Sequence, residues 1–192
     1  MAVAGQVGRI EVMGEDAMVT SEDKGALIFT TVDLGGIRPR ISDQYVLEGG
    51  EESESRSHAF FFQPDRDSTD GARGVLGLPV LREVDEAPDG RYRYTDGRLG
   101  TVVYLRRGDS RVRPLGSLDA TPGISRVDDG CVASCVDWYG DARPIFLNGR
   151  VFALLGYELV EGRESGGRMR ELRRIDMTPP TPPGPRPYYL DY

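Results

Sequence analysis

The sequence predicts an all-β fold, and three observations lead to this prediction. No window of a dozen residues carries apolar positions at helical spacing without an interrupting glycine or proline. Short β-branched and aromatic runs, such as "ALIFTTVD" at 26–33, alternate instead with turn residues such as "SEDKG" and "PDG". Finally, Asn148 and Gly149 lie between two apolar runs, and this dipeptide favours a tight hairpin because both positions accept a positive φ.

The strands expected from these runs group into repeated units joined by longer polar links. In order they are 8–13, 17–20, 26–33, 40–47, 58–64, 74–81, 92–95, 100–107, 111–118, 142–148, 150–156, 157–162 and 169–177. Three units of about 45–60 residues fit this order, which is near the period of β-propeller blades. We therefore expect a propeller-like domain over residues 1–177, with blades at 1–50, 51–120 and 121–177.

The C-terminal segment 178–192, "TPPTPPGPRPYYLDY", differs from the rest of the chain in composition. Its prolines lack the amide donors that a sheet interior needs, so an extended, polyproline-like tail is expected. A flexible terminus or linker is the simpler interpretation. A docking segment that carries the three tyrosines is the alternative.

Composition limits the classes of function. The chain has 192 residues, 39% hydrophobic and 29% charged, with a formal net charge of −7. These values are typical of a soluble globular protein, and the negative charge argues against nucleic acid as the main partner. No apolar run approaches the roughly 20 residues that cross a bilayer. The N-terminal residues also lack the basic start and apolar core of a signal peptide.

Few residues are candidates for chemistry. The two cysteines, Cys131 and Cys135, lie in "GCVASCVDWYG" and could form a local disulfide or remain two buried thiols; a metal would need further ligands that are absent nearby. His58 is the only histidine, and no G-x-S-x-G motif occurs. We therefore expect no catalytic residues, and no cofactor except for one candidate calcium loop.

That loop is "PDRDSTDGARG" at 64–74. Asp65, Asp67, Thr69 and Asp70 place several oxygen ligands in a short segment that ends in glycine, which suits a hard cation such as calcium. The spacing does not match an EF-hand, and an acidic hairpin loop in solvent is the simpler interpretation.

Several stretches together resemble one known family over roughly residues 25–176. The order "YVLEGG" (45–50), "HAFFF" (58–62) and "LPVL" (78–81) is followed by "GRYRYTDGRLGTVVYLRRGDSRVRPLGSLDA" and then by "WYGDARPIFLNGRVFALLGYELVEG" with "LRRIDM". This order is similar to secreted bacterial and archaeal proteins with a C-terminal β-propeller domain that is distantly related to WD-type repeats. The chain departs from the family pattern at Ser57, where the family has an aspartate before the histidine, and it is shorter than the family's propeller.

The resemblance implies a partial or truncated propeller in an extracellular or periplasmic protein. His58 would then begin an inner strand in a structural role, with Phe60 and Phe62 on one sheet face, Phe61 on the other, and both faces buried between blades. Trp138 and Tyr139 would lie at a rim suited to protein partners.

The function expected is a non-enzymatic binding or scaffold module whose partner is another protein chain or copies of itself. One alternative is an accessory domain or subunit of an enzyme complex. The other is a calcium-stabilised adhesion or surface-assembly protein. The sequence does not identify the ligand or the stoichiometry.

Overall fold

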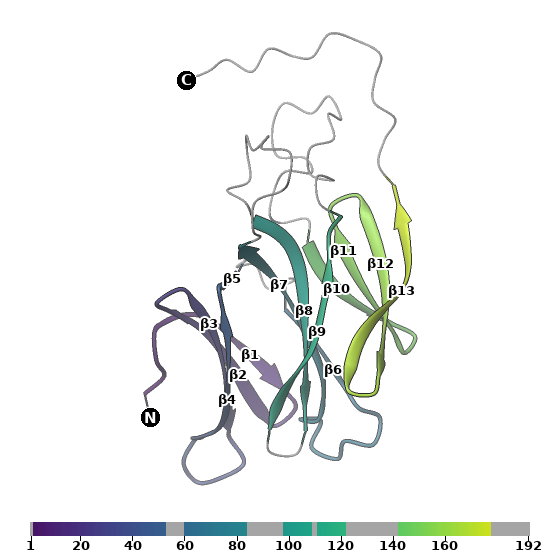
Figure 1. The fold of residues 1–192 in the computed structure, drawn as a ribbon. Helices are drawn as coiled ribbons and strands as arrows, with labels where there is room; N and C mark the ends of the chain where they lie inside the picture. Colours follow the sequence, from purple (N-terminus) through teal and green to yellow (C-terminus); the bar gives the residue numbers. More distant parts are fainter. Residues whose placement is uncertain (1, 53–59, 84–97, 109–110, 122–141, 178–192) are drawn as a thin grey trace, which may run out of the picture.

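The computed structural model describes residues 2–52, 60–83, 98–108, 111–121 and 142–177. These residues form thirteen β-strands and no helix, which confirms the all-β prediction. Every strand pairing is antiparallel, and the strands make three separate sheets. Figure 1 shows the sheets stacked face to face in chain order, here named sheets A, B and C. Among the described residues they form an open array and not a closed ring.

Sheet A is a four-stranded meander in which each strand pairs with the next. Its strands are β1 (Gln6–Met13), β2 (Asp16–Asp23), β3 (Ala26–Asp33) and β4 (Arg40–Glu48). The hairpin between β2 and β3 turns at Lys24 and Gly25, which both have positive φ. These alternating apolar runs and tight turns are the local signals from which the sequence predicted strands.

Sheet B is the middle layer, in the order β5-β7-β8-β9, and β6 also pairs with β7. Its strands are β5 (Gly50–Glu52), β6 (Phe61–Pro64), β7 (Gly74–Glu83), β8 (Arg98–Arg107) and β9 (Val112–Asp119). The two short strands β5 and β6 lie along different parts of β7. The run from Gly74 to Val80 is buried throughout, because sheet B is covered on both faces.

Sheet C is again a four-stranded meander. Its strands are β10 (Ala142–Leu147), β11 (Arg150–Leu155), β12 (Glu158–Ser165) and β13 (Arg168–Asp176). The hairpin predicted at Asn148–Gly149 joins β10 to β11, and both residues have positive φ as that turn requires. The expected strand at 92–95 lies outside the described residues.

Two apolar clusters hold the three sheets together. The first joins sheets A and B through Met18, Leu27, Phe29, Leu78 and Leu105, among others. The second joins sheets B and C through Tyr104, Leu118, Ala153, Leu155 and Val160, among others. The central strands β7 and β8 therefore send alternate side chains to opposite neighbours, as the two-residue repeat of a strand requires.

The sheets B and C approach closely at Gly77. A Cβ atom at this position would lie 2.5 Å from the Cβ of Pro144 on β10, so a larger side chain would push the two sheets apart. Nearby, Tyr104 is completely buried and its hydroxyl donates a 2.7 Å hydrogen bond to the backbone carbonyl of Phe152 on β11. Burial raises the pKa of this phenol above its ordinary value.

One expectation about the phenylalanine run is wrong. Phe60 is buried in the cluster between sheets A and B, and Phe62 packs against it, as the alternation predicts. Phe61, which points to the other side, is 40% exposed and not buried. It lies on the short strand β6, which among the described strands pairs only with β7 and forms an edge of the sheet there.

Candidate functional site

The candidate calcium loop 64–74 connects β6 to β7, and its first carboxylate is engaged by an arginine. Asp65 accepts hydrogen bonds of 2.7 and 2.9 Å from Nη1 of Arg106 on β8. Asp67 is highly exposed and pairs with Arg73 at 3.2 Å, while Thr69 is exposed. The two aspartates therefore face cationic groups of the protein itself.

The fourth predicted ligand, Asp70, stabilises the loop backbone. Its Oδ1 accepts a 2.9 Å hydrogen bond from the Ser68 hydroxyl and a 3.0 Å bond from the Ala72 amide. The Ala72 amide, followed by the Ser68 hydroxyl, lowers the pKa of this carboxyl. No group of three or more acidic, histidine or cysteine side chains placed to hold a metal occurs among the described residues. The calcium site stays a prediction, to be tested by the melting temperature with and without the ion.

The other residues selected from the sequence lie outside the described ranges. These are His58, Cys131, Cys135, Trp138 and Tyr139. Their roles, including the disulfide and the aromatic rim, stay predictions.

The strongest candidate site is the outer face of sheet C, the side that points away from sheet B. Alternation along the strands assigns side chains to it, because Ala153, Leu155 and Val160 point inward into the core cluster. In β13 the phase changes at Leu172, because the pairing with β12 shifts register there. The apolar members of this outer face are Ile145, Leu147, Phe152, Leu154, Leu159, Leu172 and Ile175. Its arginines are Arg143, Arg150, Arg163, Arg170 and Arg173.

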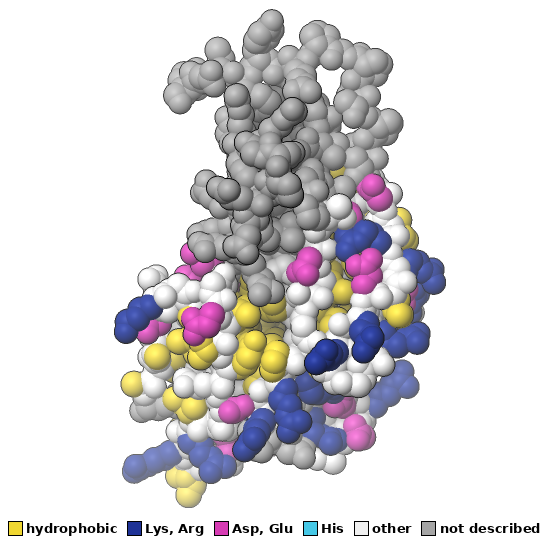
Figure 2. Space-filling model, viewed as in Figure 1, with side chains coloured by type: hydrophobic (Ala, Val, Ile, Leu, Met, Phe, Trp, Pro, Cys, Tyr) yellow, Lys and Arg dark blue, Asp and Glu magenta, His cyan; other side chains and the backbone are white. Residues whose placement is uncertain are grey.

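Exposure distinguishes this face from a packed core. Leu147 is 57% exposed, and Leu172 and Ile175 are each 47% exposed. Phe152 and Leu159 are half-buried between their neighbours in the same sheet. In Figure 2 the basic side chains gather along the right-hand edge of the molecule, where sheet C lies, and at its lower end. The face is thus a mixture of apolar and cationic groups on a protein of net negative charge.

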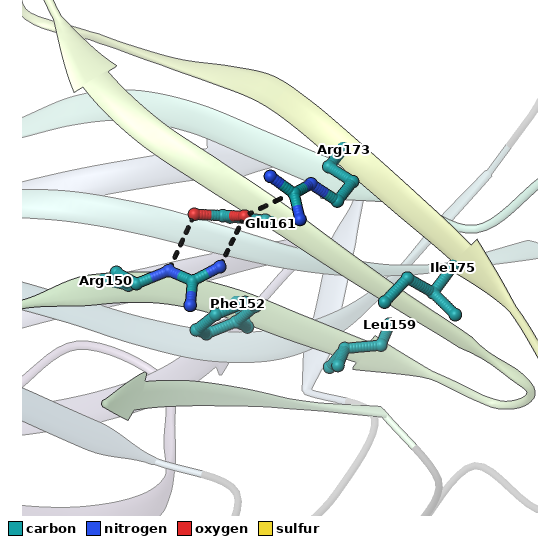
Figure 3. A pocket seen from close by; sticks show the side chains of 6 residues that line it. All are labelled: Arg150, Phe152, Leu159, Glu161, Arg173 and Ile175. Atoms are coloured by element: carbon teal, nitrogen blue, oxygen red, sulfur yellow. Dashed lines mark hydrogen bonds and ion pairs between the residues drawn. The ribbon is translucent and has the colours of Figure 1, made fainter. Parts of the chain in front are cut away.

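A shallow hollow of about 40 Å³ marks the centre of this face. Figure 3 shows its apolar part, made by Phe152, Leu159 and Ile175, beside a carboxylate held between two arginines. Such a volume admits a methyl-sized group or a water molecule, and it is far below the roughly 300–1,000 Å³ of ordinary small-molecule pockets.

The carboxylate in the hollow is Glu161. Its two oxygens accept hydrogen bonds of 2.9 and 2.8 Å from Nε and Nη2 of Arg150, and Arg173 lies 3.9 Å away. The Arg150 hydrogen bonds lower the pKa of Glu161 and raise the pKa of Arg150. The Arg150 guanidinium also stands 4.7 Å from the centre of the Phe152 ring. Three contacts therefore fix Arg150, whereas Arg173 is 68% exposed and lies at longer range from its partner.

A larger groove of about 300 Å³ adjoins the hollow and runs between sheets B and C. Arg106 lies on one wall, between Asp65 of the 64–74 loop and Glu164 of β12. Arg150 and Glu161 line both the hollow and the groove. The lining of the groove thus includes the ion pairs of Arg106, and it carries three acidic and three basic side chains, so its net charge is zero.

The outer face of sheet A lies at the other end of the stack, and it is open along its two edge strands. Its exposed apolar residues, Val7, Ile10 and Val12 on β1 and Ile41 and Val46 on β4, lie on the two edge strands. At the centre of the face, Ala17, Val19 and Val32 are buried and contact Val3. Ile10 and Val12, at 68% and 76% exposure, are the most open of its large apolar strand residues.

Sequence reasoning did not identify these faces as sites. Residues 142–155 belong to the third predicted blade, and their inward side chains lie in the core cluster. A signal that could have revealed the outer face is the arginine in phase with the outward apolar residues of three successive strands, at 143, 150 and 163.

The fold and these surfaces were compared with known proteins. Neither a scan against models of protein families nor searches of curated proteins and of solved structures find a match. The part of the chain that the structure describes contains no helix of the length and apolar character that would cross a membrane.

Proposed function

We propose that the chain is a non-enzymatic protein-binding or scaffold module and that the outer face of sheet C is its binding surface. One observation carries this proposal: the exposed side chains of Leu147, Leu172 and Ile175 lie on the same sheet face as five arginines. Proteins rarely leave such patches open without a partner. Aromatic and arginine side chains are also the residues that contribute most to protein–protein affinity.

The hollow shown in Figure 3 suits a partner that inserts one small apolar group and offers a carboxylate beside it. Phe152, Leu159 and Ile175 would contact the apolar group. The guanidinium of Arg173, exposed and at long range from Glu161, would receive the carboxylate. The carboxylates of the hollow and the groove are each paired with an arginine, which supports a surface for binding over one for catalysis.

The proposal includes a view of the fold. We take the three sheets to be consecutive blades of an incomplete β-propeller, since each is a largely sequential antiparallel array that packs face to face on the next. Export to the periplasm or the cell exterior follows from the family resemblance of the sequence. Fractionation of the producing cells tests it.

An accessory role in an enzyme complex would use the same surface. It differs only in the identity of the partner, so a partner with catalytic activity would favour it over a scaffold. A calcium-stabilised surface protein instead requires a rise in melting temperature with calcium, which Asp65→Asn would abolish.

Capture of partners tests the proposed function. Three forms of the chain are immobilised: wild type, the double variant Leu147→Glu/Ile175→Glu, and a control, Phe61→Glu, that changes an exposed apolar residue of sheet B. Each is exposed to extracts of the producing cells, and the retained proteins are quantified by mass spectrometry. We expect a partner that the double variant retains at least about tenfold less than wild type and control. Equal retention by all three forms would refute the binding surface.

A further inference from the structure

The stack of sheets ends in two different apolar faces. Of the exposed large hydrophobic residues in the described chain, all except Phe61 lie in sheets A and C or in the segments beside them. Sheet B, which has a neighbour on each side, exposes almost none. Exposure of large apolar groups therefore occurs where a neighbouring sheet is missing.

The two end sheets also differ in charge. Residues 6–48, which contain sheet A, have eight acidic and four basic side chains, a formal charge of −4. Residues 142–176, which contain sheet C, have five acidic and seven basic side chains, a formal charge of +2. Part of this charge faces sheet B, since Asp16 pairs with Arg107 there. On the outer faces themselves, the register leaves the carboxylates of Asp23 and Glu48 on sheet A and five arginines beside Glu161 on sheet C, so the two faces differ in sign and attract each other across molecules. Complementary electrostatic potentials of this kind select the relative orientation of two molecules and accelerate their encounter.

The existing sheet interfaces show how two such faces can be joined. Between sheets A and B, the apolar cluster is accompanied by the pair Arg107–Asp16 at 2.9 Å. Between sheets B and C, the second cluster is accompanied by Arg106 paired with Glu164. Both interfaces thus combine packed apolar side chains with an arginine–carboxylate pair between sheets.

We infer that the partner of the outer face of sheet C is the outer face of sheet A in a second copy of this chain. The contact would continue the face-to-face stacking from one molecule to the next. Ile10 and Val12 of one copy would pack against Leu159 and Ile175 in the hollow of the other. Because the two faces differ, the contact is heterologous and produces a ring if the rotation closes or an open array if it does not. This inference rests on the proposed function and names its partner.

Complementation between two face variants tests the inference. The C-face variant is Leu147→Glu/Ile175→Glu, and the A-face variant is Ile10→Lys/Val12→Lys. Phe61→Glu again serves as the matched control. Molar mass is measured by size-exclusion chromatography with light scattering over a range of concentrations, and circular dichroism verifies that each variant is folded. Arg173→Glu, at a side chain that is 68% exposed, replaces the C-face variant if that variant does not fold. If the A-face variant does not fold, Val46→Lys replaces it, because Val46 is an exposed position of the other edge strand, β4.

Wild type and control are expected to form oligomers. Their mass should rise continuously with concentration if the array is open, or reach a constant value if the ring closes. Each face variant alone should be a monomer, with association weakened about 30-fold or more. Their equimolar mixture should give a dimer and nothing larger, because only one intact pair of faces is available. Salt should weaken the assembly.

Three results would overturn the inference. They are a monomeric wild type, a mixture that stays monomeric, and an A-face variant that assembles like wild type. The last result would mean that the outer face of sheet C pairs with itself. If wild type is monomeric but its cell partner is still lost with the C-face variant, the proposed function stands and only the choice of a second copy is wrong.

Discussion

Replacing Tyr104 by phenylalanine isolates one polar contact between sheets B and C. The substitution keeps the ring, which makes an edge-to-face contact with Phe146 at 6.3 Å, and removes only the hydroxyl. That hydroxyl donates a 2.7 Å hydrogen bond to the Phe152 carbonyl from a completely buried position. A neutral hydrogen bond of this kind contributes about 1 kcal/mol net to stability. For a domain of this size, the melting temperature should fall by about 2–4 °C.

Thermal unfolding followed by circular dichroism measures this effect. Tyr45→Phe is the matched control, because Tyr45 packs against the cluster between sheets A and B and its hydroxyl has no hydrogen bond within the described residues. Its melting temperature should stay close to that of wild type. Tyr104→Ala should be far more destabilised, by about 3–5 kcal/mol, because it also removes the ring. Equal melting temperatures for Tyr104→Phe and wild type would show that this hydrogen bond does not stabilise the contact between sheets B and C.

Three further predictions concern the same region. Gly77→Ala should destabilise the protein by about 1–3 kcal/mol in chemical denaturation, because the new methyl group meets Pro144 at 2.5 Å; unchanged stability would contradict the close approach of the sheets. Glu161→Gln should be less stable than wild type at neutral pH. Because Arg150 lowers the folded-state pKa of Glu161, this difference should be present above the ordinary glutamate pKa and disappear as pH falls through the lowered value; a gap independent of pH would exclude the ion pair as its cause. Gly149→Ala should cost about 1 kcal/mol, measured by thermal unfolding, since its φ is +73°, and an increase in stability would contradict the positive-φ turn.

Much of the fold could be predicted because its signals are local. Hairpins such as Asn148–Gly149 depend on a few adjacent residues, and the strands on either side are fixed by two-residue alternation. The predicted strand 157–162 ends too early, because β12 continues to Ser165 before the turn at Gly166 and Gly167. Strand ends depend on pairing with the next strand, which local composition only partly specifies.

The candidate site could not be predicted in the same way. Alternation in β11 separates Phe152 from Ala153, but it does not say which of the two meets another sheet. That depends on where the stack ends, which is a property of the whole chain. The same limit explains Phe61, which was expected in a core and is exposed because β6 lies at an edge.

Each sheet is built from one uninterrupted stretch of sequence, and this has a consequence for how such a chain can change over generations. A genetic duplication that copied one stretch would add a layer at an end without rerouting any strand through the others. Loss of the stretch for sheet C would remove a single interface, while loss of the stretch for sheet B would remove both. The number of layers is therefore easy to vary on either side of the stack, whereas the middle stretch must stay compatible with two neighbouring sheets.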